Sequence, residues 1–517
     1  MLTSTLIHPF GEISFENEIA LLGNKWEEYF FDHTPFVAGA LSLDNYLIVG
    51  RRGSGKSSLM QHFLYQDTYP NSDYVNVGRA ENYNTELFDI AKRLEYSQEL
   101  AIQKLVEIWD FIIWQMIFKK LQDKSGTIRR AVETDDKDLT TSNFIKLVLR
   151  GVLNKVDMST GDDIIQMIQD KQNSRRIEKA KERVLEIVSK APLFIVIDSR
   201  EQYAINSYYE MWITAALIQC ASEFNIRYAV RGIHLKVCIA DEIFPYIKEQ
   251  FITNTLKYIR NPLYMYWRPK DLMRLICWRF FKFLNLRDLI QLKEDQINWD
   301  SHKEVYKKLW LPYFGKTLIN TRGIEENTFP YILRHTHLRP RQLIFVCNKI
   351  ASLAMAKGEF PKFSPATIVQ GVLSSEIDLA DELINSYIGI QANTGDIISS
   401  LEGLPMEFMG NELHKSAKRT SGHWSHGEYS QSEFIRLVIE LGIVGRKRGN
   451  TDHQSKIIRA DFEFAVRDRL FINEKDACVI HPLFYSKLNI NRTAPVSFCV
   501  YPFPDRPDFQ IMDDFNL

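Results

Sequence analysis

The sequence lacks the features that would place a protein in a membrane or outside the cell. None of its apolar runs reaches the length of about 18 residues that a membrane-spanning helix needs. Its N-terminal stretch has no basic segment leading into an apolar core, so we expect no secretory signal peptide. These two absences predict a cytoplasmic protein with no membrane partner.

Cysteine is scarce and shows no pairing pattern. The cysteines are Cys220, Cys238, Cys277, Cys347, Cys478 and Cys499. No two of them form a C-x-x-C pair, and none groups with histidine at a zinc-binding spacing. All but Cys499 lie in apolar segments, so we expect buried free thiols, as in a reducing cytosol, and neither disulfides nor structural zinc.

An excess of charge is also missing. Lys and Arg number 64 against 65 Asp and Glu, a net charge of -1, so a nucleic-acid site would have to come from a local cluster of basic residues. The composition is that of a globular protein, with 45% hydrophobic and 25% charged residues. A length of 517 residues suggests about three domains.

The most specific stretch is residues 46–60, Tyr-Leu-Ile-Val-Gly-Arg-Arg-Gly-Ser-Gly-Lys-Ser-Ser-Leu-Met. The apolar residues 46–49 predict a short buried strand, the following residues match G-x-x-x-x-G-K-[ST], and a helix is expected to follow. Such a loop wraps phosphates with backbone N–H groups at a helix N-terminus. The expected nucleotide-binding residues are Gly50, Arg51, Arg52, Gly53, Ser54, Gly55, Lys56, Ser57 and Ser58.

Two of these side chains have predicted roles of their own. Lys56 is expected to reach the β- and γ-phosphates, and the Ser57 hydroxyl to ligate Mg²⁺. The alternative interpretation is a Gly-rich turn between strand and helix that binds no ligand.

A second strand is predicted at residues 193–197, Leu-Phe-Ile-Val-Ile, which ends on Asp198. An acid at the tip of a central strand is the Walker B arrangement, in which Asp198 holds Mg²⁺; the alternative role is a helix N-cap or turn residue. Glu201 is the candidate to polarise the attacking water. A third strand is predicted at 233–239, and Asp241 after it is a candidate sensor of the γ-phosphate.

The other segments supply the rest of the architecture. Residues 73–78 predict a strand beside the P-loop strand, and residues 85–190 are almost entirely helical in propensity. The aromatic residues at 26–31 are expected to pack on the sheet, with a contact to the adenine base as the alternative. Near the C-terminus we expect helices at 397–408 and 431–441, separated by a polar break at 416–429.

The final segments resemble a winged helix, a module that binds either nucleic acid or a protein partner. Strands are expected at 443–446 and 457–464, joined by a turn that begins with Arg446, Lys447 and Arg448. A helix followed by a two-stranded ribbon with a basic tip is typical of a winged helix.

Four elements together resemble the prokaryotic AAA+-related P-loop ATPases, in the branch near the STAND, KAP-type and origin-recognition-like ATPases. They are Gly50–Ser57, Ile195–Asp198, Trp267-Arg-Pro-Lys-Asp-Leu with Arg279, and Leu338-Arg-Pro-Arg-Gln-Leu-Ile, and the resemblance covers roughly residues 10–360. It implies ATP and Mg²⁺ as cofactors and ATP hydrolysis as the activity. It also implies that Arg339, or else Arg341, is a sensor-2-type arginine that closes on the γ-phosphate.

The predicted fold class is α/β, a P-loop NTPase with a parallel sheet core. The expected parts are the core at 1–84 and 191–262, a large helical insertion at 85–190, a helical lid at 263–372 and a winged-helix-like α+β domain at 373–517. The segment Asp198-Ser-Arg-Glu departs from the acidic tip that is common after the Walker B strand of STAND proteins, which indicates slow hydrolysis.

Three functions are compatible with these features. The first is a switch or assembly ATPase that acts with a protein partner or as a homo-oligomer, in a bacterial conflict (antiviral defence) system with a separate effector. The second is an ATP-licensed DNA-binding protein of the origin-recognition type that contacts DNA through Arg446, Lys447 and Arg448. The third, a phosphoryl-transfer enzyme, is disfavoured by the chain length and by the lack of an acceptor-binding lid motif.

Overall fold

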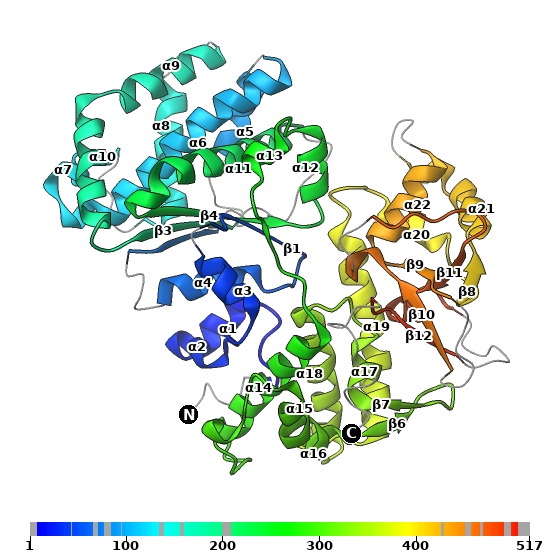
Figure 1. The fold of residues 1–517 in the computed structure, drawn as a ribbon. Coiled ribbons are helices and arrows are strands. Elements are labelled where there is room, and N and C mark those ends of the chain that lie inside the picture. Colours follow the sequence, from blue (N-terminus) through cyan, green and yellow to red (C-terminus); the bar gives the residue numbers. More distant parts are fainter. Residues whose placement is uncertain are drawn as a thin grey trace. The chain divides into compact units, whose positions relative to one another are not determined.

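The structure, a computed structural model, describes residues 8–42, 44–65, 71–76, 84–94, 96–133, 139–155, 160–198, 208–424, 429–449, 456–465, 469–490 and 498–504. The chain divides into two compact units: Pro35–Met265, and Met1–Thr34 together with Tyr266–Leu517 (Figure 1). No helix among the described residues is long and apolar enough to cross a membrane. All six cysteines are buried and free, Cys499 included, as the sequence predicts for the other five.

The unit Pro35–Met265 is built on a parallel five-stranded sheet. Its strands, in spatial order, are β2 (Asp73–Asn76), β3 (Leu193–Asp198), β4 (Ile233–Ala240), β1 (Leu47–Gly50) and β5 (Leu263–Tyr264). The prediction that residues 73–78 pair beside the P-loop strand is wrong, because β2 pairs with β3 at the edge of the sheet and β4 lies next to β1. Strand periodicity predicts burial but does not identify the neighbouring strand.

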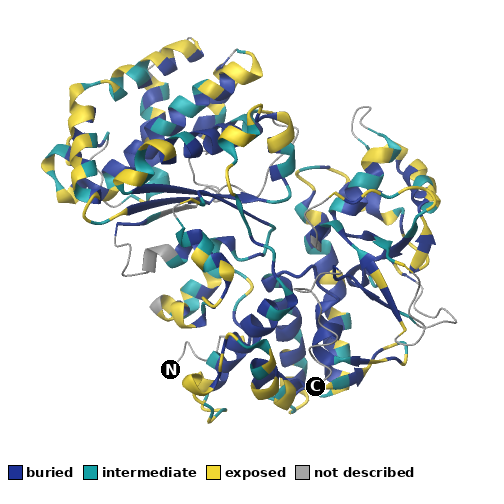
Figure 2. Ribbon diagram, in the orientation of Figure 1, coloured by how far each residue is buried: buried dark blue, intermediate teal, exposed yellow. Residues whose placement is uncertain are grey.

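The central strands are buried on both faces, as continuous apolar runs predict (Figure 2). One face of β4 presents Leu235 and Val237 to the core that the strands share with the helices above them. The opposite face carries His234 and Lys236. The Lys236 ammonium donates to the backbone carbonyls of Ser42 and Asn45, and burial lowers the pKa of Lys236 to about 7.

The predicted helical region is confirmed as helices that cover one face of this sheet, whereas α3 (Pro35–Leu41) and α4 (Lys56–Tyr65) lie on the other face (Figure 1). The region comprises α5 (Asn84–Arg93), α6 (Gln98–Leu121), α7 (Gly126–Arg129), α8 (Thr141–Lys155), α9 (Gly161–Gln172) and α10 (Arg175–Val188). Helix α6 packs along α11 (Tyr208–Tyr228), and α11 packs on β4. The Trp109 indole N–H donates to the Ile213 carbonyl at 2.9 Å, so the two helices are joined by a polar contact as well.

The N-terminal aromatic residues pack within the second unit, against α14 (Pro269–Leu286), whereas the prediction placed them on the sheet of the core. The Phe31 ring lies 6.0 Å from that of Trp278 between centroids, and the Trp278 indole donates to the Glu28 carbonyl at 3.1 Å. Arg279 forms two hydrogen bonds of 2.6 and 3.0 Å to the buried Glu18 of α1 (Phe15–Leu22). Residues 1–34 thus group with 266–517, while the predicted four-part division stays a prediction.

The second unit continues with a helical part. It contains α2 (Trp26–Tyr29), α15 (His302–Val305), the π-helical turn η6 (Tyr306–Trp310), α16 (Leu311–Phe314), α17 (Thr328–Leu333), α18 (Pro340–Ala356) and α19 (Pro365–Ser386). A short hairpin, β6 (Thr317–Ile319) with β7 (Glu325–Asn327), precedes α17. Helix α18 packs on both α14 and α19.

The C-terminal part is a winged-helix-like α+β domain, as predicted. Its elements are α20 (Thr394–Ser399), β8 (Glu407–Met409), α21 (Asn411–Arg419), α22 (Gln431–Glu440), β9 (Val444–Lys447), β10 (Ile457–Asp461), β11 (Ala477–Ile480) and β12 (Cys499–Tyr501). The sheet order is β12-β10-β9-β11-β8. Two details of the prediction are wrong: the helix expected at 397–408 ends at Ser399, and the expected polar break at 416–429 begins inside α21.

Candidate nucleotide-binding site

The phosphate-binding loop lies between β1 and α4, where the motif predicts it. Gly53 and Gly55 have φ values of 75° and 92°, a region that side chains disfavour, so glycine is required at both places. At Gly50, a Cβ atom would come within 2.6 Å of the Ser54 hydroxyl oxygen. The glycines of the motif therefore give the loop its tight curvature.

Lys56 is the first residue of α4 and is only 4% exposed. Its ammonium nitrogen donates to the carbonyl oxygens of Gly50, at 2.7 Å, and Arg51, at 3.1 Å. The lysine head is thus folded across the start of the loop, at the carboxyl end of β1. The position of Lys56 is the one that the motif predicts, and its role on the β- and γ-phosphates stays a prediction.

Ser57 and Asp198 meet although they are 141 residues apart in the chain, with 2.7 Å from the Ser57 hydroxyl to Oδ2 of Asp198. Asp198 closes β3 and is 5% exposed. A hydroxyl and a carboxylate are the oxygen ligands that Mg²⁺ prefers, and Mg²⁺ takes its other ligands from phosphates and water. The donor set therefore fits a Mg²⁺–nucleotide, although the described residues contain no group of three or more His, Cys, Asp or Glu side chains that could hold a metal by themselves.

The acidic tip of β4 holds the start of the loop, a contact that the sequence did not predict. The Asp241 N–H donates to the Gly50 carbonyl at 3.2 Å, and its carboxylate lies 3.6 Å from Nε of Arg51. The backbone N–H of Arg52 donates to Oε1 of Glu242 at 3.1 Å. Asp241 thus contacts the loop, and its role as a γ-phosphate sensor stays a prediction.

The two candidate sensor arginines belong to the second unit. Arg339 is the N-cap residue of α18 and is 5% exposed, whereas Arg341 is half-buried and forms an ion pair of 3.4 Å with Glu382 of α19. Leu338, just before them, has a φ of 54°, so the chain turns sharply into the helix. Their action on a nucleotide stays a prediction, and the candidate catalytic residue Glu201 lies outside the described residues.

The Trp-Arg-Pro-Lys-Asp motif has a structural role. Arg268 is the N-cap residue of α14, and its guanidinium Nε donates to Oδ2 of Asp271 at 2.6 Å. Arg274 contacts Oδ1 of the same carboxylate, which is only 1% exposed. The motif therefore fixes the first turns of α14.

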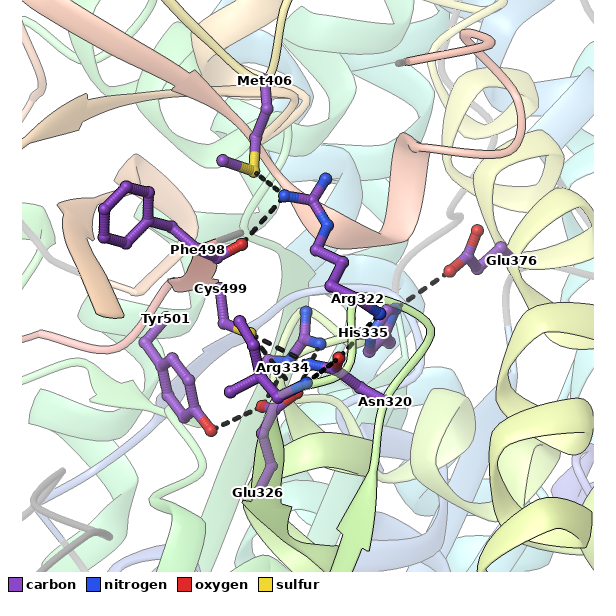
Figure 3. A network of polar contacts seen from close by, with 11 residues as sticks. Asn320, Arg322, Glu326, Arg334, His335, Glu376, Met406, Phe498, Cys499 and Tyr501 are labelled. Carbon is purple, nitrogen blue, oxygen red and sulfur yellow. Dashed lines mark hydrogen bonds and ion pairs between the residues drawn. The ribbon is translucent and has the colours of Figure 1, made fainter. Parts of the chain in front are cut away.

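A buried polar network in the second unit joins the hairpin before α17 to the C-terminal strand β12 (Figure 3). Glu326 accepts two hydrogen bonds of 2.9 Å from Arg334 and one of 2.6 Å from the Tyr501 hydroxyl. Burial raises the pKa of Glu326, but the charge and hydrogen bonds of Arg334 outweigh it, and the net pKa is lowered. No sequence pattern predicts the contact between Glu326 and Tyr501, which lie 175 positions apart.

The same network continues to α19. His335 lies 3.1 Å from the Glu376 carboxylate, and the Ser486 N–H donates to that carboxylate at 3.2 Å. Burial, followed by the charge of Arg334, lowers the pKa of His335. Burial also lowers the pKa of His481, whose ring lies 4.6 Å from that of His337.

The basic residues predicted to contact DNA are engaged with their own domain. Arg446 donates to the Phe471 carbonyl at 3.3 Å, and Lys447 pairs with Glu407 at 2.5 Å. Arg448 pairs with Asp461 at 3.0 Å and donates to the Phe503 carbonyl at 2.6 Å. These contacts neutralise part of the positive charge that the sequence places at this turn.

No family model matches the sequence, and no curated protein matches it. Among solved structures, the chain is similar to the ORC2 protein of Aeropyrum pernix, which was solved in ADPNP-ADP complexes. The two chains share 12% sequence identity with a TM-score of 0.32, and the match covers 80% of this chain and 83% of that one. It is also similar to Cdc6p of Pyrobaculum aerophilum, at 13% identity and a TM-score of 0.30, covering 90% and 92%. Scores this low carry no inference about the function of this chain.

Proposed function

We propose that the chain binds ATP with Mg²⁺ and hydrolyses it slowly, as a switch or assembly ATPase. The observation that carries the proposal is the meeting of Ser57 and Asp198 at 2.7 Å beside the buried Lys56. A strand, a glycine-shaped loop and a helix N-terminus bring these groups together in the arrangement that triphosphate binding requires. A turn without a ligand would not need a buried lysine or a carboxylate aimed at the serine.

Each side chain has a distinct part in the proposal. Lys56 binds the β- and γ-phosphates, and the loop N–H groups bind the phosphate oxygens. Ser57 and Asp198 would hold Mg²⁺, which supplies charge neutralisation between the phosphates. Glu201 is proposed to orient the attacking water, and Arg339 to stabilise charge on the γ-phosphate; Arg341 is the second choice, because Glu382 already pairs with it.

The binding test is an equilibrium titration with Mg²⁺–ATP. We expect Lys56→Ala to weaken binding by on the order of 100-fold, the loss of two charge-assisted contacts at about 1.5 kcal/mol each. The matched control is Lys120→Ala, an exposed lysine at the end of α6 in the same unit, which should bind like the wild type. Unchanged ATP affinity in Lys56→Ala would overturn the site assignment.

Hydrolysis is tested separately, by phosphate release at saturating ATP. Glu201→Gln and Arg339→Ala should keep ATP affinity within a few-fold of the wild type and lower turnover. Arg341→Ala should have the smaller effect. Turnover at the wild-type level in both of the first two variants would leave a nucleotide-binding protein whose catalytic residues lie elsewhere.

The proposed switch acts on a protein partner or through self-assembly, within a bacterial conflict system that has a separate effector. The support is the resemblance to switch ATPases and the lack, in the sequence, of a nuclease, protease, TIR or deaminase motif. Mass photometry with and without ATP would show whether nucleotide changes the assembly state. An unchanged mass in both conditions, with no partner recovered by pull-down, would contradict an assembly role.

A second candidate function is ATP-dependent DNA binding, and one observation favours it. Helix α21 presents Lys415 to solvent one helical turn before Lys418 and Arg419, within the winged-helix-like domain, and Lys415 also pairs with Glu412 at 2.6 Å. Fluorescence anisotropy with duplex DNA at several salt concentrations would compare neutralisation of these three residues with neutralisation of Arg446, Lys447 and Arg448. A reduced salt slope in the α21 variant alone would support DNA contact through that helix.

A further inference from the structure

The tip of β4 places two carboxylates directly beside the phosphate-binding loop. Strand β4 runs parallel to β1 with Ala240 opposite Gly50, so the residues that follow the two strands emerge side by side. The Asp241 N–H extends this ladder by donating to the Gly50 carbonyl at 3.2 Å. The contact of two acids with the loop is thus a consequence of strand register and does not depend on a mobile segment.

The two acids hold two successive loop residues in different ways. Asp241 faces the Arg51 guanidinium at 3.6 Å, with side chains 13% and 14% exposed. Glu242 accepts a hydrogen bond from the backbone N–H of Arg52 at 3.1 Å. A P-loop holds phosphate oxygens with its backbone N–H groups. The Glu242 carboxylate already accepts a hydrogen bond from one N–H of this loop, so the protein supplies a negative charge of its own where the loop binds anions.

The same end of the loop is where a third phosphate would be bound. Lys56, the residue that reaches the β- and γ-phosphates, has its head on the carbonyls of Gly50 and Arg51, next to the atoms that Asp241 and Glu242 hold. ATP brings about one more negative charge to this place than ADP does. Repulsion between like charges in a partly buried site is only weakly screened by salt.

From this geometry, and resting on the proposed nucleotide binding, we infer that Glu242, aided by Asp241, sets the preference between ATP and ADP. Glu242 positions the Arg52 N–H and places a fixed negative charge where the third phosphate approaches, so it lowers the affinity for ATP more than that for ADP. Glu242 and Asp241 together would keep the protein in its ADP-bound form until ATP is abundant or until a partner favours the ATP-bound form.

The test measures equilibrium affinities for ADP and for a slowly hydrolysed ATP analogue in the full-length protein. Glu242→Gln keeps the size and the hydrogen-bond acceptor but removes the charge, and it should raise the ratio of ATP-analogue to ADP affinity by about 5- to 10-fold, the 1–1.4 kcal/mol typical of one like-charge contact. Glu182→Gln, an exposed glutamate on α10, is the matched control and should leave the ratio unchanged. Asp241→Asn gives a second, independent version of the test if Glu242→Gln does not fold.

The outcomes separate this inference from the proposed function. An unchanged ratio in both variants would show that the acidic tip only supports the loop, and would overturn the inference while ATP binding stands. Equal weakening of both nucleotides in Glu242→Gln would also overturn it, since that result points to a structural clamp without selectivity. A wild-type protein that binds neither nucleotide would overturn the proposed function together with the inference.

Discussion

Substituting Glu326 by glutamine tests how much of the second unit depends on its buried polar network. Glu326 is 6% exposed and Arg334 5%, and two hydrogen bonds of 2.9 Å join them as a bidentate pair (Figure 3). Glutamine preserves the size of the side chain but removes the negative charge. The Arg334 guanidinium would then be a buried cation without its principal counter-charge.

The expected cost follows from this burial. Removing one partner of a buried ion pair typically costs about 3–5 kcal/mol, because the remaining charge stays desolvated. Because this unit has nearly 300 residues, each kcal/mol lowers the melting temperature by about 1.5–2 °C, and the expected decrease is roughly 5–10 °C. Tyr501→Phe removes one hydrogen bond to the same carboxylate and should cost less, about 1.5–3 kcal/mol.

The assay is thermal denaturation followed by circular dichroism, with Glu325→Gln as the matched control. Glu325 is the preceding residue of β7 and is exposed, so its substitution should leave the melting temperature unchanged. The double variant Glu326→Met with Arg334→Met removes both charges and should be more stable than Glu326→Gln alone. Equal melting temperatures for Glu326→Gln and Glu325→Gln would refute the reasoning, as would a double variant less stable than the single one.

Three further predictions concern the loop, the metal and pH. Gly53→Ala places a side chain on a residue whose φ is 75°, which adds about 1 kcal/mol of strain to the loop. The variant should therefore bind Mg²⁺–ATP at least about 5-fold more weakly, as measured by isothermal titration calorimetry. Unchanged affinity would contradict the requirement for a left-handed conformation at this residue. Asp198→Asn should lower the Mg²⁺ dependence of ATP affinity while Mg²⁺-free binding persists, and an unaltered Mg²⁺ titration would exclude Asp198 as a metal ligand. Burial lowers the pKa values of His335 and His481 below their values in the unfolded chain, so the unfolded chain binds more protons at low pH. The free energy of unfolding should therefore fall as the pH drops below about 6.5, by up to about 2.7 kcal/mol per pH unit for the two groups together. Chemical denaturation between pH 7.5 and 5.5 measures this slope. Replacing both histidines with glutamine should reduce it, and His234, whose pKa burial lowers to about 4, should account for part of the slope that is left.

The loop could be predicted from sequence because its constraints are local. Gly53 and Gly55 are needed for the backbone, and Lys56 and Ser57 follow at fixed positions on the helix N-terminus, so a run of eight residues specifies the shape. Asp198 could be predicted for a related reason, since a fully apolar strand that ends on an acid is rare. The acidic tip of β4 carries a similar signal, which makes Asp241 a candidate sensor but does not single out Glu242.

Other features depend on contacts that no short pattern encodes. The order of strands in the sheet is set by crossover connections, so the neighbour of β2 could not be inferred from its own residues. Helix α21 was missed because it buries only Leu413, Ser416 and Ala417, which is too weak an apolar pattern to stand out among charged neighbours. The pairing of Glu326 with Tyr501 joins two segments between which the sequence predicts no contact.

The helical insertion bears on the site more directly than its place in the chain suggests. Leu105 and Ile112 of α6 belong to the same buried core as Ile195 and Ile197 of β3, the strand that carries Asp198. A deletion of the insertion would expose part of this shared core to water, and we expect it to destabilise the sheet that carries Asp198. The insertion is therefore part of the core of the unit Pro35–Met265 in energetic terms, and we expect a chain without it to fold poorly.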